Sequence, residues 1–247
     1  MENVLKRIVK FIPRKIKKSL FGNINKLQMD IQKVYGGIMF SSAIQDSEWL
    51  KYKAFSFEGW AMDAVALHNL FRILNDVKPK NIIEFGLGQS SKMVHQYAEY
   101  YKANAMTVEH DKEWIEYVKT LAPLIKFNIL QTDLETVKVN GIQTVSYKNI
   151  GQICGNDKIN LYIVDGPPGQ LRYSRSQILD VVPEKLANDF CIFMHDTERL
   201  GEKETIDILC TKLNQNGVDF IKRDYGCAAR WHTVICSKSW KFLTSIC

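Results

Sequence analysis

The sequence predicts a single α/β domain with a mostly parallel central sheet and helices on both faces. Short apolar runs rich in β-branched and aromatic residues alternate with stretches of helical periodicity over most of the 247 residues, which is the pattern of successive strand and helix units. The run 81–85 is followed by a Gly-Leu-Gly turn, and the run 159–164 by Asp-Gly-Pro-Pro-Gly. With 46% hydrophobic residues, the chain can bury one large core and has little left for a second.

The first part of the domain is expected to supply three strands and three helices. Apolar residues at helical spacing predict a helix over 58–77 that covers the sheet. The first strand, 81–85, is rich in isoleucine, and Ser90 or Ser91 can cap the helix after the glycine turn. The same patterns place strands over 105–109 and 127–130 and a helix over 111–121.

The second part alternates in the same way. The largely apolar runs at 159–164 and 190–194 predict two further strands. The remaining expected elements are helices over 176–186 and 202–215, strands over 218–222 and 233–236, and a turn at 224–226.

The Gly-Leu-Gly turn after the first strand is a candidate nucleotide site. Gly86 and Gly88 let a ligand approach the backbone where a strand ends and a helix begins, which is where open α/β sheets bind nucleotides. Glu84 precedes the turn by two residues, and Glu109 ends the second strand 23 residues after Gly86. A carboxylate in that second position can accept both hydroxyl protons of a ribose.

These residues resemble the first motif of the class I S-adenosylmethionine-dependent methyltransferases, which is an acid, any residue and a Gly-x-Gly turn. The resemblance spans roughly residues 58–240. It implies a Rossmann-like sheet of seven strands with the last strand antiparallel between its neighbours, and S-adenosylmethionine as the cofactor. A serine stands where many members carry a third glycine, and it still permits close approach. The residues that would bind the cofactor are Glu84, Gly86, Gly88, Ser90 and Glu109.

Two further residues are candidates for the adenine end of the cofactor. Asp133 follows the third strand, where many such methyltransferases place an adenine-binding acid, although an acid at this point can equally cap a turn. His110 follows the ribose acid and is expected along the adenine edge.

Polar residues also end the strands 159–164 and 190–194. Asp165 follows the first, and His195 with Asp196 follows the second, so neighbouring parallel strands should bring the three side chains together. In metal-dependent small-molecule O-methyltransferases, which this pattern resembles, such residues hold a divalent ion. We therefore expect either a Mg²⁺ or Mn²⁺ site at Asp165, His195 and Asp196, or catalysis by His195 as the base with Asp165 orienting it.

The acceptor is expected to be a hydroxyl on a saccharide or another small glycan precursor. The Gly-Pro-Pro-Gly and His-Asp-Thr-Glu-Arg segments are similar to those of bacterial and plant methyltransferases that act on sugars. Arg172, Tyr173 and Arg199 lie near these strand ends and are the candidate substrate residues, because guanidinium groups bind carboxylates, phosphates and hydroxyls in fixed geometry. A surface salt bridge is the alternative for the arginine pair at 172 and 175.

The amino terminus carries the whole net charge of +6. Residues 1–20 contain seven Lys or Arg and one acid, with apolar residues at helical spacing, and Pro13 is expected to kink the segment. Such an arm can bind an anionic membrane surface or pack as a solvated helix on its own domain. We expect a short turn and a helix at 26–34 to join the arm, as part of a 1–45 extension, to the 46–247 domain.

Composition bears on location and partners. No apolar run is long enough to span a bilayer and no signal-peptide pattern is present, so the chain is expected in the cytoplasm, with a peripheral location on the inner face of the membrane as the alternative that the basic arm allows. The six cysteines show no Cys-x-x-Cys pair, which is typical of reduced, buried thiols rather than a zinc site. No nucleic-acid partner is expected, because the chain beyond the arm is neutral. The oligomeric state is left open.

Two other functions remain open from the sequence. An oxidoreductase that uses NAD or a nucleotide sugar would need the same glycine turn. A non-catalytic membrane-surface module of a polysaccharide assembly complex would keep the fold and work through the basic arm.

Overall fold

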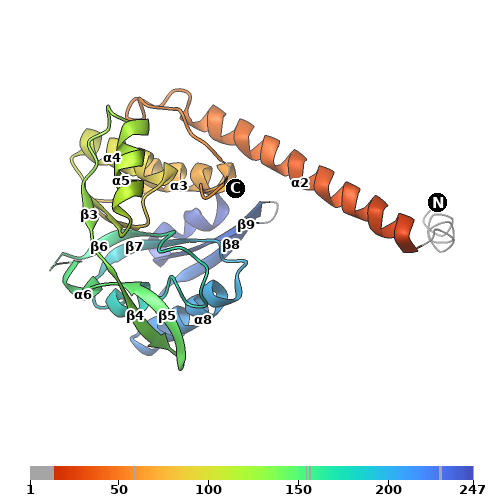
Figure 1. The fold of residues 1–247 in the computed structure, drawn as a ribbon. Helices are drawn as coiled ribbons and strands as arrows, with labels where there is room; N and C mark the ends of the chain where they lie inside the picture. The colour runs from red at the N-terminus through yellow and green to blue at the C-terminus, as the bar shows by residue number, and fades with distance from the viewer. Residues whose placement is uncertain (1–13, 58, 154, 156, 228–229, 247) are drawn as a thin grey trace.

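The computed structural model describes residues 14–57, 59–153, 155, 157–227 and 230–246. Its centre is a seven-stranded sheet in the order β3-β2-β1-β6-β7-β9-β8 (Figure 1). The strands β1, β2, β3, β6 and β7 are parallel, and β9 is antiparallel to both of its neighbours. This confirms the predicted sheet, including its last strand. The strands are β1 (Asn81–Phe85), β2 (Asn104–Glu109), β3 (Ile129–Gln131), β6 (Ile159–Val164), β7 (Leu186–His195), β8 (Ile221–Cys227) and β9 (Arg230–Cys236).

Helices cover both faces of the sheet because side chains alternate along each strand. Ile82 and Leu161 face a core formed with α3 (Ala64–Val77), α4 (Gln89–Tyr101) and the 3₁₀ helix η1 (Lys238–Ser245). Ile83 and Tyr162 face a second core on the opposite side. That core is completed by α6 (Ile150–Ile153), α7 (Ile178–Val181) and α8 (Leu200–Gln215), while α5 (Lys112–Leu121) packs beside Leu87 at the edge.

A two-stranded antiparallel hairpin, which the sequence reading missed, follows β3. It consists of β4 (Leu134–Val139) and β5 (Ile142–Tyr147), joined at Asn140 and Gly141, both with positive φ. Asn-Gly is a strong signal for a hairpin turn of this kind. The hairpin matters for function because β5 delivers Tyr147 to the carboxyl edge of the main sheet.

Three predicted boundaries in the second half were wrong. The expected helix over 176–186 is reduced to α7, because Pro183 has no amide hydrogen to continue a helix and the chain enters β7 at Leu186. The predicted turn at 224–226 lies inside β8, where Asp224 pairs with Thr233 of β9. The expected strand at 218–222 accordingly begins only at Ile221.

The helix α2 (Arg14–Ile44) is continuous for 31 residues. The predicted turn near residue 22 and the separate helix at 26–34 were therefore wrong, since a glycine costs a helix only about 1 kcal/mol relative to alanine and does not break it. At Gly36 a Cβ would lie 2.8 Å from the Val65 side chain of α3, so the missing side chain allows the two helices to approach. The following turns bury Phe40 and Ile44 in the core.

The basic arm falls largely outside the described residues, because Pro13 and everything before it are among those not described. The predicted kink and membrane contact therefore stay predictions, as does the boundary between residues 45 and 46. Across the described ranges, no helix combines the length and the hydropathy that a membrane span requires.

Candidate functional site

The turns after β1 and β6 touch each other through two glycines. Gly86 has a φ of +96°, and a Cβ on it would lie 2.8 Å from the amide nitrogen of Gly166. A Cβ on Gly166 would lie 2.6 Å from the Cα of Gly86. Because only glycine fits at both positions, the two strand ends are locked side by side, and the groups they carry share one edge of the sheet.

Gly88 has a different surrounding. It is the N-cap of α4, its amide donates to Ser91 Oγ at 2.9 Å, and a Cβ on it would meet nothing within 4 Å. Its backbone is extended, so neither packing nor φ requires a glycine here. The open space beside the first amides of α4 is where an incoming polar group can meet the positive end of the helix.

Glu84 lies beneath this turn and is fully buried. Ser90 Oγ donates to one of its carboxylate oxygens at 2.6 Å, and Thr107 Oγ1 donates to the other at 2.7 Å. Burial raises the pKa of Glu84 to about 7, against the effect of these hydrogen bonds. Glu84 and Ser90 therefore support the turn from inside, and their predicted cofactor contacts remain predictions.

Glu109 joins the turn to the end of β2. One carboxylate oxygen accepts from the Leu87 amide at 2.9 Å, and the other accepts from the amides of His110 and Asp111 at 2.7 and 3.0 Å. Three amides hold the group in place, and a carboxylate has about four acceptor positions. A carboxylate held in this way is positioned to accept a hydrogen bond from a hydroxyl group beside the glycine turn.

The two predicted adenine residues lie near this edge but differ in surroundings. His110 Nδ1 is 2.6 Å from Glu109 Oε1, and its ring lies edge-on to Tyr147 at 6.4 Å. Asp133 is exposed between β3 and the hairpin, and its carbonyl accepts from the Lys148 amide. Both roles stay predictions.

Tyr147 is a residue that the sequence reading missed. Its ring stacks on Phe85 with centroids 6.1 Å apart, and its hydroxyl lies where a Cβ on Gly166 would approach to 2.6 Å. Within the described part of the chain, this buried hydroxyl has no hydrogen-bond partner. Burial raises the pKa of Tyr147 well above 10, so the group is a neutral donor in the space that Glu109 and Asp165 share.

At the other strand ends, an imidazole lies between two carboxylates. His195 Nδ1 is 3.0 Å from Asp165 Oδ1, and Nε2 is 3.5 Å from Asp63 Oδ2. Asp63 was also missed: it caps α3, with its other oxygen accepting from the amides of Val65 and Ala66. Asp63 precedes the first strand and belongs to no recognisable sequence motif, and it lies beside His195 only in the folded chain.

The surrounding charges keep His195 protonated. Burial disfavours the imidazolium, but the negative charge and hydrogen bond of Asp165, the hydrogen bond of Asp63 and the charge of Asp196 together raise the pKa of His195 to about 9. The pKa of Asp165 is lowered: burial opposes this, but the charges of His195 and Arg175 outweigh it. The cluster is therefore an ionised network at neutral pH.

Arg175 completes the cluster from the loop before α7. Its Nη2 is 3.2 Å from Asp165 Oδ1 and 2.9 Å from Asp196 Oδ2, and its Nη1 donates to the His195 carbonyl at 2.7 Å. Arg199 Nη2 also contacts Asp196 Oδ2, at 2.7 Å. Asp63, Asp165 and Asp196 thus each lie beside at least one cation, and a fourth acid, the buried Glu202, lies 4.0 Å from Arg199 Nη1.

This arrangement does not fit a divalent metal ion. The donor atoms of Asp165, His195 and Asp196 lie within 4.8 Å of one another, a spacing that an ion could bridge. A nitrogen of Arg175 already lies between the two carboxylates, however, and His195 carries the proton that a metal ligand must lose. The predicted metal role of these residues is not supported by the geometry.

We therefore expect activity to survive removal of divalent ions. After dialysis against EDTA, turnover should match that of the untreated protein, and added Mg²⁺ or Mn²⁺ should not raise it. Loss of turnover on chelation with recovery on adding Mg²⁺ would show that an ion displaces Arg175.

The three predicted substrate residues all have protein partners. Arg172 donates through Nε to Glu204 of α8 at 2.6 Å, as the salt-bridge alternative anticipated. Tyr173 is buried with a φ of +66°, while Arg199 is one third exposed and holds Asp196. Their roles in substrate binding remain predictions, with Arg199 the best placed.

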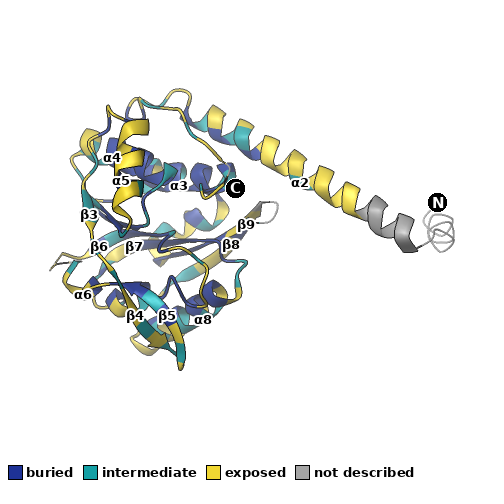
Figure 2. Cartoon of the chain, in the orientation of Figure 1, coloured by how far each residue is buried: buried dark blue, intermediate teal, exposed yellow. Residues whose placement is uncertain are grey.

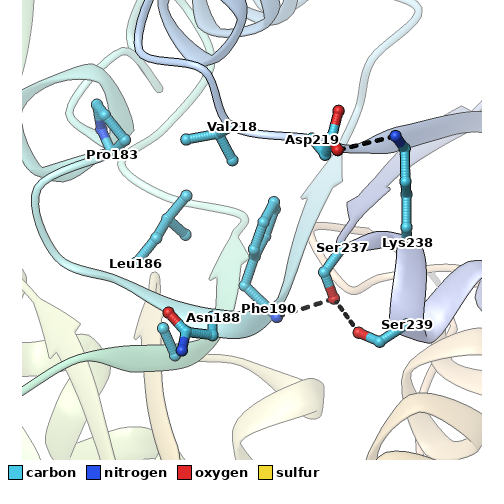
Figure 3. Close-up of a pocket in the computed structure, with 10 residues that line it drawn as sticks. Pro183, Leu186, Asn188, Phe190, Val218, Asp219, Ser237, Lys238 and Ser239 are labelled. Atoms are coloured by element: carbon cyan, nitrogen blue, oxygen red, sulfur yellow. Dashed lines mark hydrogen bonds and ion pairs between the residues drawn. The ribbon is translucent and has the colours of Figure 1, made fainter.

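A hollow of about 390 Å³ lies at the other end of β7 from His195 (Figure 3). Phe190, Leu186 and Val218 form its apolar wall, and Asp219 and Lys238 form an ion pair at its rim. It contains none of the groups described above and lies at the amino end of β7, so we do not assign the chemistry to it.

No protein-family model and no curated protein matches the sequence. Similar solved structures include the SAH-bound methyltransferase PaMTH1 from Podospora anserina, 11% identical over 78% of this chain and 92% of its own, with a TM-score of 0.49. A methyltransferase from Pyrococcus furiosus is 11% identical over 84% of this chain and 96% of its own, with a TM-score of 0.47. A spermidine synthase bound to AdoDATO is 12% identical over 70% of this chain and 61% of its own, with a TM-score of 0.45. At these scores the likeness carries no argument about cofactor, reaction or acceptor.

Proposed function

We propose that this protein is a methyltransferase that passes the sulfonium methyl of S-adenosylmethionine to a hydroxyl group. The observation that carries the proposal is the contact between Gly86 and Gly166. This contact brings the amides of α4 and the fixed Glu109, which would form the nucleoside site, to the same edge of the sheet as the imidazole held between Asp63 and Asp165. The sequence motif supports S-adenosylmethionine as the nucleoside.

The cofactor would bind on the β1 and β2 side of this edge. Glu109 would accept a hydrogen bond from a ribose hydroxyl at its remaining acceptor position, and the Tyr147 hydroxyl would donate to a polar group of the ligand. The open space at Gly88 leaves room for the ligand against the start of α4. Methyl transfer is a displacement, so the main task of the fold is to align the oxygen, the methyl carbon and the sulfur.

The acceptor hydroxyl would bind at His195 Nε2. His195 is 1% exposed and Asp63 Oδ2 lies 3.5 Å from this nitrogen, longer than a strong charge-assisted bond of about 2.7–2.9 Å, so an acceptor oxygen would have to take the place of Asp63 at Nε2. Asp165 accepts from Nδ1 and leaves Nε2 as the base once the imidazole has lost its extra proton. With the cofactor bound, Nε2 would take the proton of the acceptor hydroxyl, and the methyl group would pass from sulfur to that oxygen with the thioether of S-adenosylhomocysteine as the leaving group.

A saccharide is our preferred acceptor class. Trp60 is 76% exposed and lies three residues before Asp63, in a loop that Arg230 holds through the carbonyls of Gly59 and Ala61. An exposed aromatic ring in a fixed loop can cover the apolar face of a sugar while its hydroxyls reach the charged cluster. This supports the class of acceptor and leaves its identity open.

Ligand binding separates this function from an oxidoreductase. We expect S-adenosylhomocysteine to raise the melting temperature of the protein in a saturable way, because it binds only the folded state. NADH should give neither a thermal shift nor saturable quenching of tryptophan fluorescence. The reverse pattern would refute the methyltransferase proposal and favour the oxidoreductase.

A further inference from the structure

The first half of α2 stands clear of the domain (Figures 1 and 2). Residues 22–35 are all exposed except Met29, which is half-buried, and the helix joins the core only from Gly36 onward. Six large hydrophobic side chains on this helix are 50–64% exposed. One is Tyr35, and the five aliphatic ones are Ile24, Leu27, Ile31, Val34 and Ile38.

These five residues, which we call the α2 stripe, follow a heptad pattern. Successive members are separated by three, four, three and four positions, giving a mean repeat of 3.5 residues. A helix that packs on a globular core shows a wider apolar face with a period near 3.6, whereas a 3.5 repeat is the seam of a left-handed coiled coil. The stripe therefore suits a second helix that runs along it.

An unsupported helix of this composition would be only marginally stable. Gly22, Gly36 and Gly37 each cost about 1 kcal/mol relative to alanine, and isolated helices gain most of their stability from packing. Gly22 and Gly37 have no neighbouring group within 4 Å of a built Cβ, so contacts within the chain do not offset their cost. A partner along the stripe would supply the missing packing.

We propose that the stripe binds the α2 helix of a second copy of this chain in a parallel two-stranded coiled coil. Ile24, Ile31 and Ile38 would occupy the a positions, and Leu27 and Val34 the d positions. Branched residues at a, with leucine at d, favour two parallel strands.

The residues beside the stripe are compatible with a like partner. At the e and g positions that flank the stripe, Asp30 of one helix would face Tyr35 of the other, and Asn23 would face Gln28, so no like charges meet along the stripe. The sequence at the start of α2, residues 14–18, is basic, so repulsion between the like charges of the two copies weakens the pair there. Burying five such side chains from each chain removes on the order of 1,000 Å² from water, at the lower limit for a specific interface. The dimer should therefore dissociate on dilution.

A second copy fits this surface better than a lipid bilayer does. From residue 22 to residue 40 the charged residues are Lys26, Asp30 and Lys33, so this part of α2 carries a net charge of only +1. Helices that lie on anionic membranes have a broad apolar face flanked by many Lys or Arg residues. The α2 stripe is narrow and has few cations beside it.

Sedimentation equilibrium of the full chain tests the proposal. Wild type should show a reversible monomer–dimer equilibrium, Ile31→Lys should be monomeric at every concentration at which wild type is dimeric, and Asn25→Lys should behave as wild type. Asn25 is the matched control because it is exposed on α2 outside the stripe. An unchanged thermal shift with S-adenosylhomocysteine in Ile31→Lys would show that the domain is still folded.

Oxidation of a Leu27→Cys variant tests whether the two α2 helices run parallel. It should give a disulfide-linked dimer that wild type does not form, because a residue at a d position lies beside the same residue of the other copy only in a parallel pair. A monomeric wild type, a dimeric Ile31→Lys, or no cross-link would each overturn the proposal. So would a monomer whose stripe residues are needed for flotation with anionic liposomes, which would assign the surface to a membrane.

Discussion

Replacing His195 with alanine is expected to lower kcat by about two to four orders of magnitude, the usual contribution of a positioned general base. The imidazole is held by Asp165 at 3.0 Å, and its Nε2, which would serve as the base, lies 3.5 Å from Asp63 Oδ2. Binding of S-adenosylhomocysteine should be nearly unchanged, because the residues that would hold it, Glu109 and the glycine turn, lie at the ends of β2 and β1, whereas His195 ends β7. A variant that keeps wild-type kcat would remove His195 from the mechanism.

The pH profile gives a sharper form of the same expectation. Because the pKa of His195 is raised to about 9, the neutral base is scarce at pH 7, and the rate should rise about tenfold per pH unit before levelling near pH 9. With an unperturbed histidine as the base, the rate would instead level off at about pH 6.5.

Asp63→Asn should move the midpoint of the pH–rate profile to lower pH, since it removes a negatively charged group from beside the imidazolium of His195. Asparagine is also a good N-cap, so α3 should remain intact. The same change at Asp46, which is exposed and distant in sequence from the cluster, serves as the control. A profile that does not respond to Asp63→Asn would mean that another group sets the pH dependence.

Glu109→Ala should weaken binding of S-adenosylmethionine by about 100-fold. Each charge-assisted hydrogen bond contributes about 1.5–3 kcal/mol, and one acceptor position of the carboxylate is left for a ribose hydroxyl beside the three amides. Part of the loss would come from the freed Leu87 amide, which now donates to Glu109 at 2.9 Å. Isothermal titration calorimetry measures the change.

Two companion variants interpret the result. Glu109→Gln keeps one oxygen that can accept from the amides, places a donor NH2 group where the other oxygen accepted, and has no charge, so its affinity should fall between those of wild type and alanine. Glu113→Ala removes an exposed acid from α5 nearby and should bind as wild type does. Equal affinities for all four proteins would mean that the ribose site lies elsewhere.

The sequence by itself determined the sheet and the residues at its carboxyl edge. Apolar runs ending in Glu84, Glu109, Asp165 and His195 identified the strands, because in a parallel sheet the strand ends with polar residues gather at one edge. Helices beside the sheet followed from their periodicity. The hairpin 134–147 also had a local signal, the Asn-Gly turn, which was overlooked.

Only the tertiary structure decided the partners of these residues. Asp63 precedes the first strand by some twenty positions and reaches His195 because α3 begins beside β7, which no local pattern records. Arg175 lies between Asp165 and Asp196, and that placement replaces an expected metal site with an ionic network. The pKa of His195 depends on these distances and on burial, since electrostatic energy is set by separation in space and not by spacing along the chain.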